Sequence, residues 1–213
     1  MKKVVNHYSI NKLFWVFIIG SFIGALIEIL WVYFVDHKFM SRSSLLYGQF
    51  SVIWGFGCVI LTLLFRKMQN RSNSIIFLIG TIVGGVYEYA CSFLSEKVFG
   101  VVFWDYRHIP FNIHGRVNLM YCFFWGLISV VWVRYLYPAL SHAIDMIPTH
   151  LGKTFSNAII IFLIFDMLLS ASSLIRASQR KRNIPADNAV ERYLDQKYTD
   201  EYLSHRYQNM KTY

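Results

Sequence analysis

The chain has 213 residues, of which 55% are apolar, 18% aromatic and only 15% charged. Soluble domains carry nearer a quarter charged residues, and the apolar residues here gather in runs too long for a soluble core. The net charge of +9 does not indicate nucleic-acid binding. The basic residues stand mostly at the ends of apolar runs, as membrane sorting requires, and no compact basic stripe accompanies them.

We therefore predict an all-α membrane protein with three parts. These are a short basic N-terminal segment (residues 1–12), a transmembrane domain (13–175) and a charged C-terminal tail (176–213). A bilayer core takes about 20 apolar residues in a helix. Five runs qualify as spans: Leu13–Val35, Leu45–Phe65, Ser74–Ser95, Val117–Leu136 and Ser156–Ile175. An odd number of spans places the termini on opposite sides of the membrane. The numbers of Lys and Arg near the membrane on its two sides are similar, so the orientation stays open.

An internal echo is the most informative feature of the sequence. Residues 17–28 read FIIGSFIGALIE and residues 77–88 read FLIGTIVGGVYE, with five of the twelve positions identical. A polar loop follows each copy, and then a second span that contains Trp-Gly, at Trp54-Gly55 and at Trp125-Gly126. The pattern predicts that the first four spans form two helical hairpins in the same orientation, a parallel repeat of the kind found in transport folds. Chance similarity between two apolar helices is the alternative.

In both copies, two glycines precede a glutamate at a spacing of four residues. They are Gly20 and Gly24 before Glu28, and Gly80 and Gly84 before Glu88. Residues at this spacing share one helix face, and glycines on such a face let helix backbones approach closely in lipid. We interpret the glycines as helix-packing positions, and we expect each glutamate to point into the protein.

Three acidic residues lie inside the predicted spans: Glu28, Glu88 and Asp166. A carboxylate near the bilayer centre costs at least ~2.5 kcal/mol, so such a residue usually faces a cavity or a partner. We predict that they bind substrate or relay protons, with neutral acids or a shared proton favoured by desolvation. Structural hydrogen bonding is the alternative.

The loop between the third and fourth spans is unusually polar and aromatic. We select as further candidates for binding or proton relay Asp105, Arg107, Asn112, Arg116, Asn118 and Tyr121, with Trp104 and Tyr106 as aromatic lid residues. One interpretation is an interfacial belt with head-group-facing arginines. The other is a re-entrant lid in which Arg116 or Arg107 neutralises Glu88 or Glu28. No metal site or cofactor is predicted, because the histidines lack a companion at ligand spacing.

The tail after residue 176 is rich in charges and tyrosine. We expect a solvated or interface-lying tail, with a partner-binding helix over about residues 189–207 as the alternative.

Several short motifs resemble one bacterial family. They are Gly-x-x-x-Glu in the first span, Tyr-Glu-Tyr in the third, Trp104-Asp105-Tyr106, Pro110-Phe111-Asn112, Gly115-Arg116 and Leu119-x-Tyr121. Over roughly residues 13–176 the chain resembles the ABC-transporter permease family of the CmpB type, with a weaker likeness to uncharacterised eukaryotic transmembrane proteins. The resemblance implies a multi-span membrane protein. It marks as motif positions Glu28, Glu88, Trp104, Asp105, Tyr106, Asn112, Gly115 and Arg116. Family members usually have serine where this chain has Arg107.

Three functions fit these features. The first is a transport component of the bacterial cell membrane that binds or moves a small solute or lipid at an acidic cavity between the hairpins. The second is an intramembrane enzyme acting on a lipid or isoprenoid, with Glu28, Glu88 or Asp105 as general acid or base. The third is a structural or regulatory subunit. We expect membrane lipid, a separate ATPase or other membrane subunit, or a second copy of the chain as partners.

Overall fold

The fold was analysed in a computed structural model, which describes residues 9–147 and 149–212, without the side chains of 149–153 and 212. Most of the predicted basic N-terminal segment therefore lies outside the described residues. The helices are α1 (Ile10–Asp36), α2 (Val52–Phe65), α3 (Asn73–Phe99), α4 (Leu119–Val131), the π-helical turn η1 (Trp132–Leu136), α5 (Tyr137–Asp145), α6 (Thr149–Lys181), α7 (Ala189–Lys197) and α8 (Asp200–Arg206). The short strands are β1 (Val101–Val102), β2 (Asn112–Ile113), β3 (Val117–Asn118) and β4 (Lys211–Thr212).

Local sequence signals set the helix ends. The Ser72 side chain accepts a hydrogen bond from the Ile75 amide and so caps the N-terminus of α3. The same helix ends at Gly100, which has a φ of 68° and donates its amide to the Glu96 carbonyl. Glycine adopts this left-handed conformation without strain, so the chain can turn sharply into the loop. The loop ends at Asn118, whose side chain caps α4.

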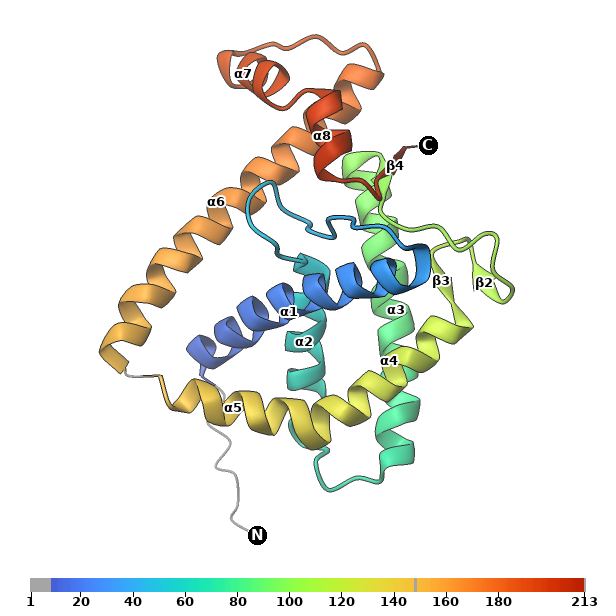
Figure 1. The fold of residues 1–213 in the computed structure, drawn as a ribbon, viewed down its shortest axis with the longest axis vertical. Coiled ribbons are helices and arrows are strands. Elements are labelled where there is room, and N and C mark those ends of the chain that lie inside the picture. The colour runs from blue at the N-terminus through green and yellow to red at the C-terminus, as the bar shows by residue number, and fades with distance from the viewer. Residues whose placement is uncertain (1–8, 148, 213) are drawn as a thin grey trace.

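Four helices are long and apolar enough to cross a membrane: Ile10–Asp36, Asn73–Phe99, Leu119–Asp145 and Thr154–Lys181. The third of these is α4, η1 and α5 joined into one continuous helix, drawn in yellow across the lower half of Figure 1. It runs nine residues beyond the predicted end at Leu136. The protein is therefore an integral, multi-pass membrane protein built of helices.

The predicted second span is wrong in its first seven residues. Only Val52–Phe65 is helical, 14 residues in length, which at 1.5 Å per residue is about 21 Å. The preceding segment is apolar but irregular, and Gly48 within it has a φ of 71°. Its backbone is satisfied by tertiary contacts, because the Leu46 and Tyr47 amides donate to Ser170 and Asp166 of α6.

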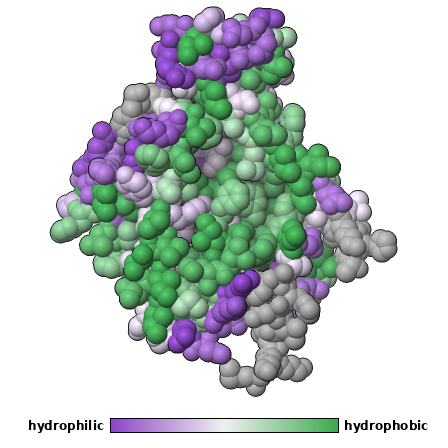
Figure 2. All heavy atoms as spheres, turned by 180° about the vertical axis from the view of Figure 1, so that it is seen from behind, coloured by the Kyte–Doolittle hydropathy of each residue, from purple (hydrophilic) through white to green (hydrophobic). Residues whose placement is uncertain are grey.

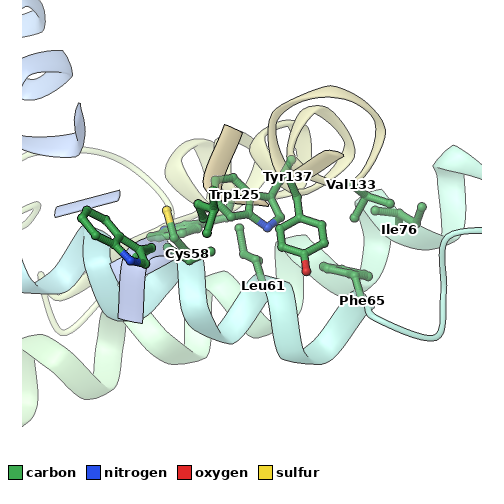
Figure 3. Close-up of a cluster of buried hydrophobic side chains, with 11 residues drawn as sticks. Cys58, Leu61, Phe65, Ile76, Trp125, Val133 and Tyr137 are labelled. Carbon is green, nitrogen blue, oxygen red and sulfur yellow. The ribbon is translucent and has the colours of Figure 1, made fainter. Parts of the chain in front are cut away.

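The main apolar core lies among α1, α2, α3 and the α4–α5 helix. Figure 3 shows Leu61 and Phe65 of α2 in one cluster with Trp125, Val133 and Tyr137. In lipid, apolar burial alone does not drive helices together, so close packing and polar contacts decide the arrangement.

The molecular surface matches a lipid environment over its middle. Figure 2 shows apolar residues across the centre of one face, with hydrophilic residues gathered over the C-terminal helices at the top. Leu78, Leu127 and Phe165 are among the apolar side chains more than half exposed. Such a band is expected where acyl chains cover the protein.

The C-terminal tail folds back onto the helices. Leu194, Tyr198 and Leu203 are almost fully buried. Arg206 of α8 donates to the carbonyl oxygens of Leu45 at 2.9 Å and of Gly48 at 2.5 Å. Strand β4 also pairs with β1. The tail thus packs over the irregular segment before α2, with an apolar side that its total charge conceals.

Candidate functional site

The first carboxylate of the candidate site belongs to Glu28 on α1. The Trp54 indole on α2 donates to Oε1 at 2.5 Å, and Nε of Arg42, in the loop after α1, donates to Oε2 at 2.8 Å. The side chains of Glu28 and Arg42 are 29% and 18% exposed. Glu28 is therefore a half-buried carboxylate whose charge is neutralised by an arginine from the following loop.

The second carboxylate belongs to Glu88 on α3, which is 8% exposed. The Trp125 indole on α4 donates to Oε2 at 3.3 Å, and the Tyr106 hydroxyl, in the loop after α3, donates to Oε1 at 2.8 Å. Both of these donors are neutral. Glu88 is thus deeper in the protein than Glu28 and is held by an indole and a phenol.

The glycines of the echoed motif lie where the helices of each pair meet. A Cβ atom at Gly24 would collide with the Trp54 side chain, and one at Gly84 would collide with the Trp125 side chain. One turn earlier the contacts also match, Gly20 with Cys58 and Gly80 with Ser129. The absence of side chains at these positions lets each tryptophan approach the helix that carries its glutamate.

The two tryptophans join the two helix pairs. Their rings stack with centroids 5.5 Å apart and planes 28° from parallel. The Tyr87 hydroxyl of α3 also donates to the Ile53 carbonyl of α2 at 2.6 Å. Since each stacked indole donates to one carboxylate, Glu28 and Glu88 belong to a single polar cluster.

Tyr106 covers this cluster from the loop. Its ring stacks on Tyr121 of α4, with centroids 4.6 Å apart. Burial, and next the Glu88 carboxylate, raise the pKa of the Tyr106 phenol well above its usual range, with Tyr121 and Glu28 adding to the effect. The phenol therefore stays protonated and remains a hydrogen-bond donor, and both glutamates are close enough to act on it.

The other candidate residues of the loop hold its shape. The Trp104 indole donates to the Arg116 carbonyl at 2.8 Å. The Asn112 side chain donates to the Ile109 carbonyl and accepts from the Gly115 amide. Gly115 itself has a φ of 69°. Asn118, 2% exposed, caps α4 and donates to the Pro110 carbonyl.

The predicted pairing of Arg116 or Arg107 with the buried glutamates is wrong. Nη2 of Arg116 donates to Glu96 at 2.5 Å, and Arg107 forms an ion pair with Asp105 at 2.8 Å. Glu96 lies two helical turns beyond Glu88, toward the end of α3 where the loop begins. The loop geometry therefore turns the guanidinium of Arg116 toward the nearer acid and leaves Tyr106 to reach Glu88.

Asp166 belongs to a different part of the molecule. It is fully buried on α6, accepts from the Tyr47 amide at 3.2 Å and from the Ser170 hydroxyl at 3.3 Å. Its carboxylate anchors the irregular segment before α2, on which the tail also packs. This is the structural alternative considered for the buried acids.

Three residues of the cluster are absent from the predicted set: Arg42, Trp54 and Trp125. The repeated Trp-Gly pair is a signal that could have identified the two indoles. Arg42 has a weaker signal, its place in the loop that follows the first glutamate-bearing helix.

Comparison with known families assigns the chain. Residues 15–171 match the family described as "Putative ABC-transporter type IV", of the CmpB type. The chain belongs to this family. The match supports the family resemblance of the motifs and, with the four apolar helices, a transporter-like, integral membrane protein. No curated protein and no solved structure matches the chain.

Proposed function

We propose that the protein is a permease-like component that binds or moves a small solute or lipid at the Glu28–Glu88 cluster. The observation that carries this proposal is the joining of two intramembrane carboxylates through stacked indoles, under a loop that supplies Tyr106. Intramembrane acids held in this way are typical of substrate and proton pathways. The loop after α3 serves in this proposal as a re-entrant lid.

The proposal includes a parallel repeat, in which α1 and α2 correspond to α3 and α4. Its support is the recurrence of one set of contacts, in which an indole of the second helix packs on a glycine of the first and donates to the first helix's glutamate. Transport folds are commonly built from two such halves, with the binding site at their interface. Five crossings are then required, with the short α2 among them.

A separate ATPase subunit is the partner that the family suggests. In this proposal the ATPase subunit hydrolyses ATP and the chain provides the membrane-embedded site. We place the assembly in the bacterial cell membrane.

The alternative function, an intramembrane enzyme, would use Glu88 as its acid–base group. A carboxylate that is 8% exposed and touches a phenol could act as general acid or base on a bound lipid or isoprenoid. A structural or regulatory subunit is the third possibility, in which the acids serve packing alone.

The test is to purify the protein in native lipid and identify co-purified small molecules and proteins by mass spectrometry. We expect a molecule recovered with the wild type to be lost from both Glu28→Gln and Glu88→Gln. Glu201→Gln, the same change at an exposed position of α8, serves as control. A companion ATPase supports the permease, whereas a chemically altered lipid supports the enzyme. Equal recovery from all variants excludes the cluster as the binding site.

A further inference from the structure

A second polar site lies beside the loop after α3. A cavity of about 210 Å³ opens there, and its polar lining comes from Ser92, Glu96, Trp104, Arg107, His114 and Arg116. This volume is much larger than the ~30 Å³ that a water molecule occupies in the liquid.

Two of the residues that line this cavity each have a buried polar atom without a partner. Oγ of Ser92 and Nη1 of Arg116 have no hydrogen-bond partner within residues 9–147 and 149–212. The side chain of Ser92 is 2% exposed. Leaving a buried donor unpaired costs about 1–3 kcal/mol, and more when the donor is charged. Two such donors around one cavity therefore indicate a ligand that brings oxygen acceptors.

The guanidinium of Arg116 is held in place by its other contacts. Nη2 donates to Glu96, and the group lies 5.5 Å from the Phe93 ring centroid and 5.8 Å from that of Tyr89. The Arg116 carbonyl accepts from Trp104. The Nη2 side of the guanidinium is thus held by protein, whereas Nη1 is buried and has no partner among the described residues.

We infer that this cavity binds a phosphate group, either in a lipid head group or as free phosphate. Arginine offers planar, charged donors that suit phosphate oxygens, and a serine hydroxyl can donate to a second oxygen. Arg116 pairs with Glu96, and Arg107, which also lines the cavity, pairs with Asp105. The two ion pairs cancel in charge, so the donor that remains for a phosphate oxygen is Nη1 of Arg116, beside the Ser92 hydroxyl.

The position of the cavity fits a head group. Ser92 is one helical turn beyond Glu88, and Glu96 is one turn further toward the end of α3. In a membrane-crossing helix this end approaches the head-group layer, where phosphates are concentrated. The inference concerns a site separate from the Glu28–Glu88 cluster and does not depend on the transport proposal.

The experiment uses the full chain in dodecyl maltoside. Thermal unfolding is followed while inorganic phosphate, or mixed micelles with phosphatidylglycerol, are titrated at constant ionic strength. Acetate and phosphate-free monogalactosyl diacylglycerol are the matched controls. A ligand of the folded protein raises the apparent Tm in a saturable way. Stabilisation by inorganic phosphate alone identifies free phosphate as the ligand, and stabilisation by phosphatidylglycerol identifies the lipid head group. Both results support the inference.

Two variants place the binding at this cavity. Ser92→Ala and Arg116→Gln should each weaken the apparent affinity for the stabilising phosphate probe by about tenfold or more. Ser92→Ala also removes an unpaired hydroxyl, so it should not destabilise the unliganded protein. Controls are Ser173→Ala, whose buried hydroxyl donates within α6, and the exposed Arg66→Gln. Glu88→Gln should bind phosphate as the wild type does.

Three outcomes would overturn the inference. They are no stabilisation by either phosphate probe, equal stabilisation by acetate or the phosphate-free lipid, and unchanged titrations in both Ser92→Ala and Arg116→Gln. Loss of phosphate binding in Glu88→Gln with retention in Ser92→Ala would move the site to the other cluster and reject this cavity.

Discussion

Glu28 and Glu88 have matching places in two helix pairs, yet they differ in their surroundings. Each follows two glycines on a long helix and accepts a hydrogen bond from the tryptophan of the next helix. The second donor is Arg42 for Glu28 and Tyr106 for Glu88. Glu28 thus has an opposite charge beside it, whereas Glu88 is more deeply buried among neutral donors.

This difference shows how a shared scaffold can give two carboxylates different chemistry. The helices and the indole fix the geometry, and one residue of the following loop sets the charge. An arginine places a full opposite charge beside Glu28, whereas Glu88 is buried and accepts hydrogen bonds from an indole and a phenol, both neutral. We therefore expect the loss of Arg42 and the loss of the Tyr106 hydroxyl to affect the protein to different extents.

The first prediction concerns the direction in which the helices cross the membrane, and its outcome is all-or-none. If the two pairs are equivalent, α1 and α3 cross the membrane the same way and α2 crosses between them. The termini then lie on opposite sides. Reporter fusions at Met1 and Tyr213 measure this directly. Both reporters in one compartment would mean that α2 does not cross, and the comparison between the pairs would fail.

The largest expected stability change comes from filling the helix contacts. Gly84→Val and Gly24→Val each push a branched side chain into a tryptophan, and overpacking of this kind costs about 3 kcal/mol. Thermal unfolding in detergent measures the loss. Leu78→Val, a β-branched change at an exposed site on α3, is the control. A large loss at only one of the two glycines would show that the contacts are not equivalent.

The next largest loss of stability should come from breaking the Arg42–Glu28 ion pair. Arg42→Gln leaves a half-buried carboxylate without its cation, and we expect a loss of about 2 kcal/mol, between the values for surface and buried pairs. Glu28→Gln in the same chain should restore much of that loss. The double-mutant cycle is measured by thermal unfolding, with exposed Arg66→Gln as control. Additive losses would show that Arg42 does not stabilise the Glu28 carboxylate.

The sequence predicts the helical class well because long apolar runs permit little else in a membrane. Its main error, the start of α2, has a tertiary cause. Leu45 and Leu46 look like part of a span, but they are buried where the segment hydrogen-bonds to α6 and the tail. The high hydropathy of these residues reflects their burial. It does not distinguish a helix from an irregular segment whose backbone groups hydrogen-bond to other parts of the protein.

Partner choice within the site is harder to predict than its members. Glu28, Glu88 and Tyr106 can be selected from the sequence, since intramembrane acids and a nearby polar loop are conspicuous. Which arginine reaches which acid depends on loop direction. The hydrogen bond from Trp104 to the Arg116 carbonyl helps set the direction of Arg116, and no spacing rule encodes it.

Tyr106→Phe should have a smaller effect than loss of Arg42. It removes one hydrogen bond to Glu88 and leaves the ring stacked on Tyr121, so we expect a loss of about 1 kcal/mol. Thermal unfolding near neutral pH measures it. Tyr135→Phe, at an exposed tyrosine, is the matched control. An unchanged Tm in Tyr106→Phe would show that the loop does not hold Glu88.

The smallest expected effect is a pH dependence of the difference in stability between the wild type and Tyr106→Phe. Burial and the Glu88 carboxylate raise the pKa of Tyr106 in the folded state above the ordinary value of 10.0. Below that value the phenol is protonated in both folded and unfolded chains, so its stabilising contribution is fully present. As the pH approaches about 10, the unfolded chain begins to lose this proton while the folded chain keeps it, and the folded state loses about 0.4 kcal/mol of stability by pH 10. Tyr106→Phe lacks the group and should lose less. The stabilities of wild type and variant should therefore draw closer together between about pH 8 and about pH 10. Curves that stay parallel, as expected for Tyr135→Phe, would show that the phenol is not held against the carboxylate.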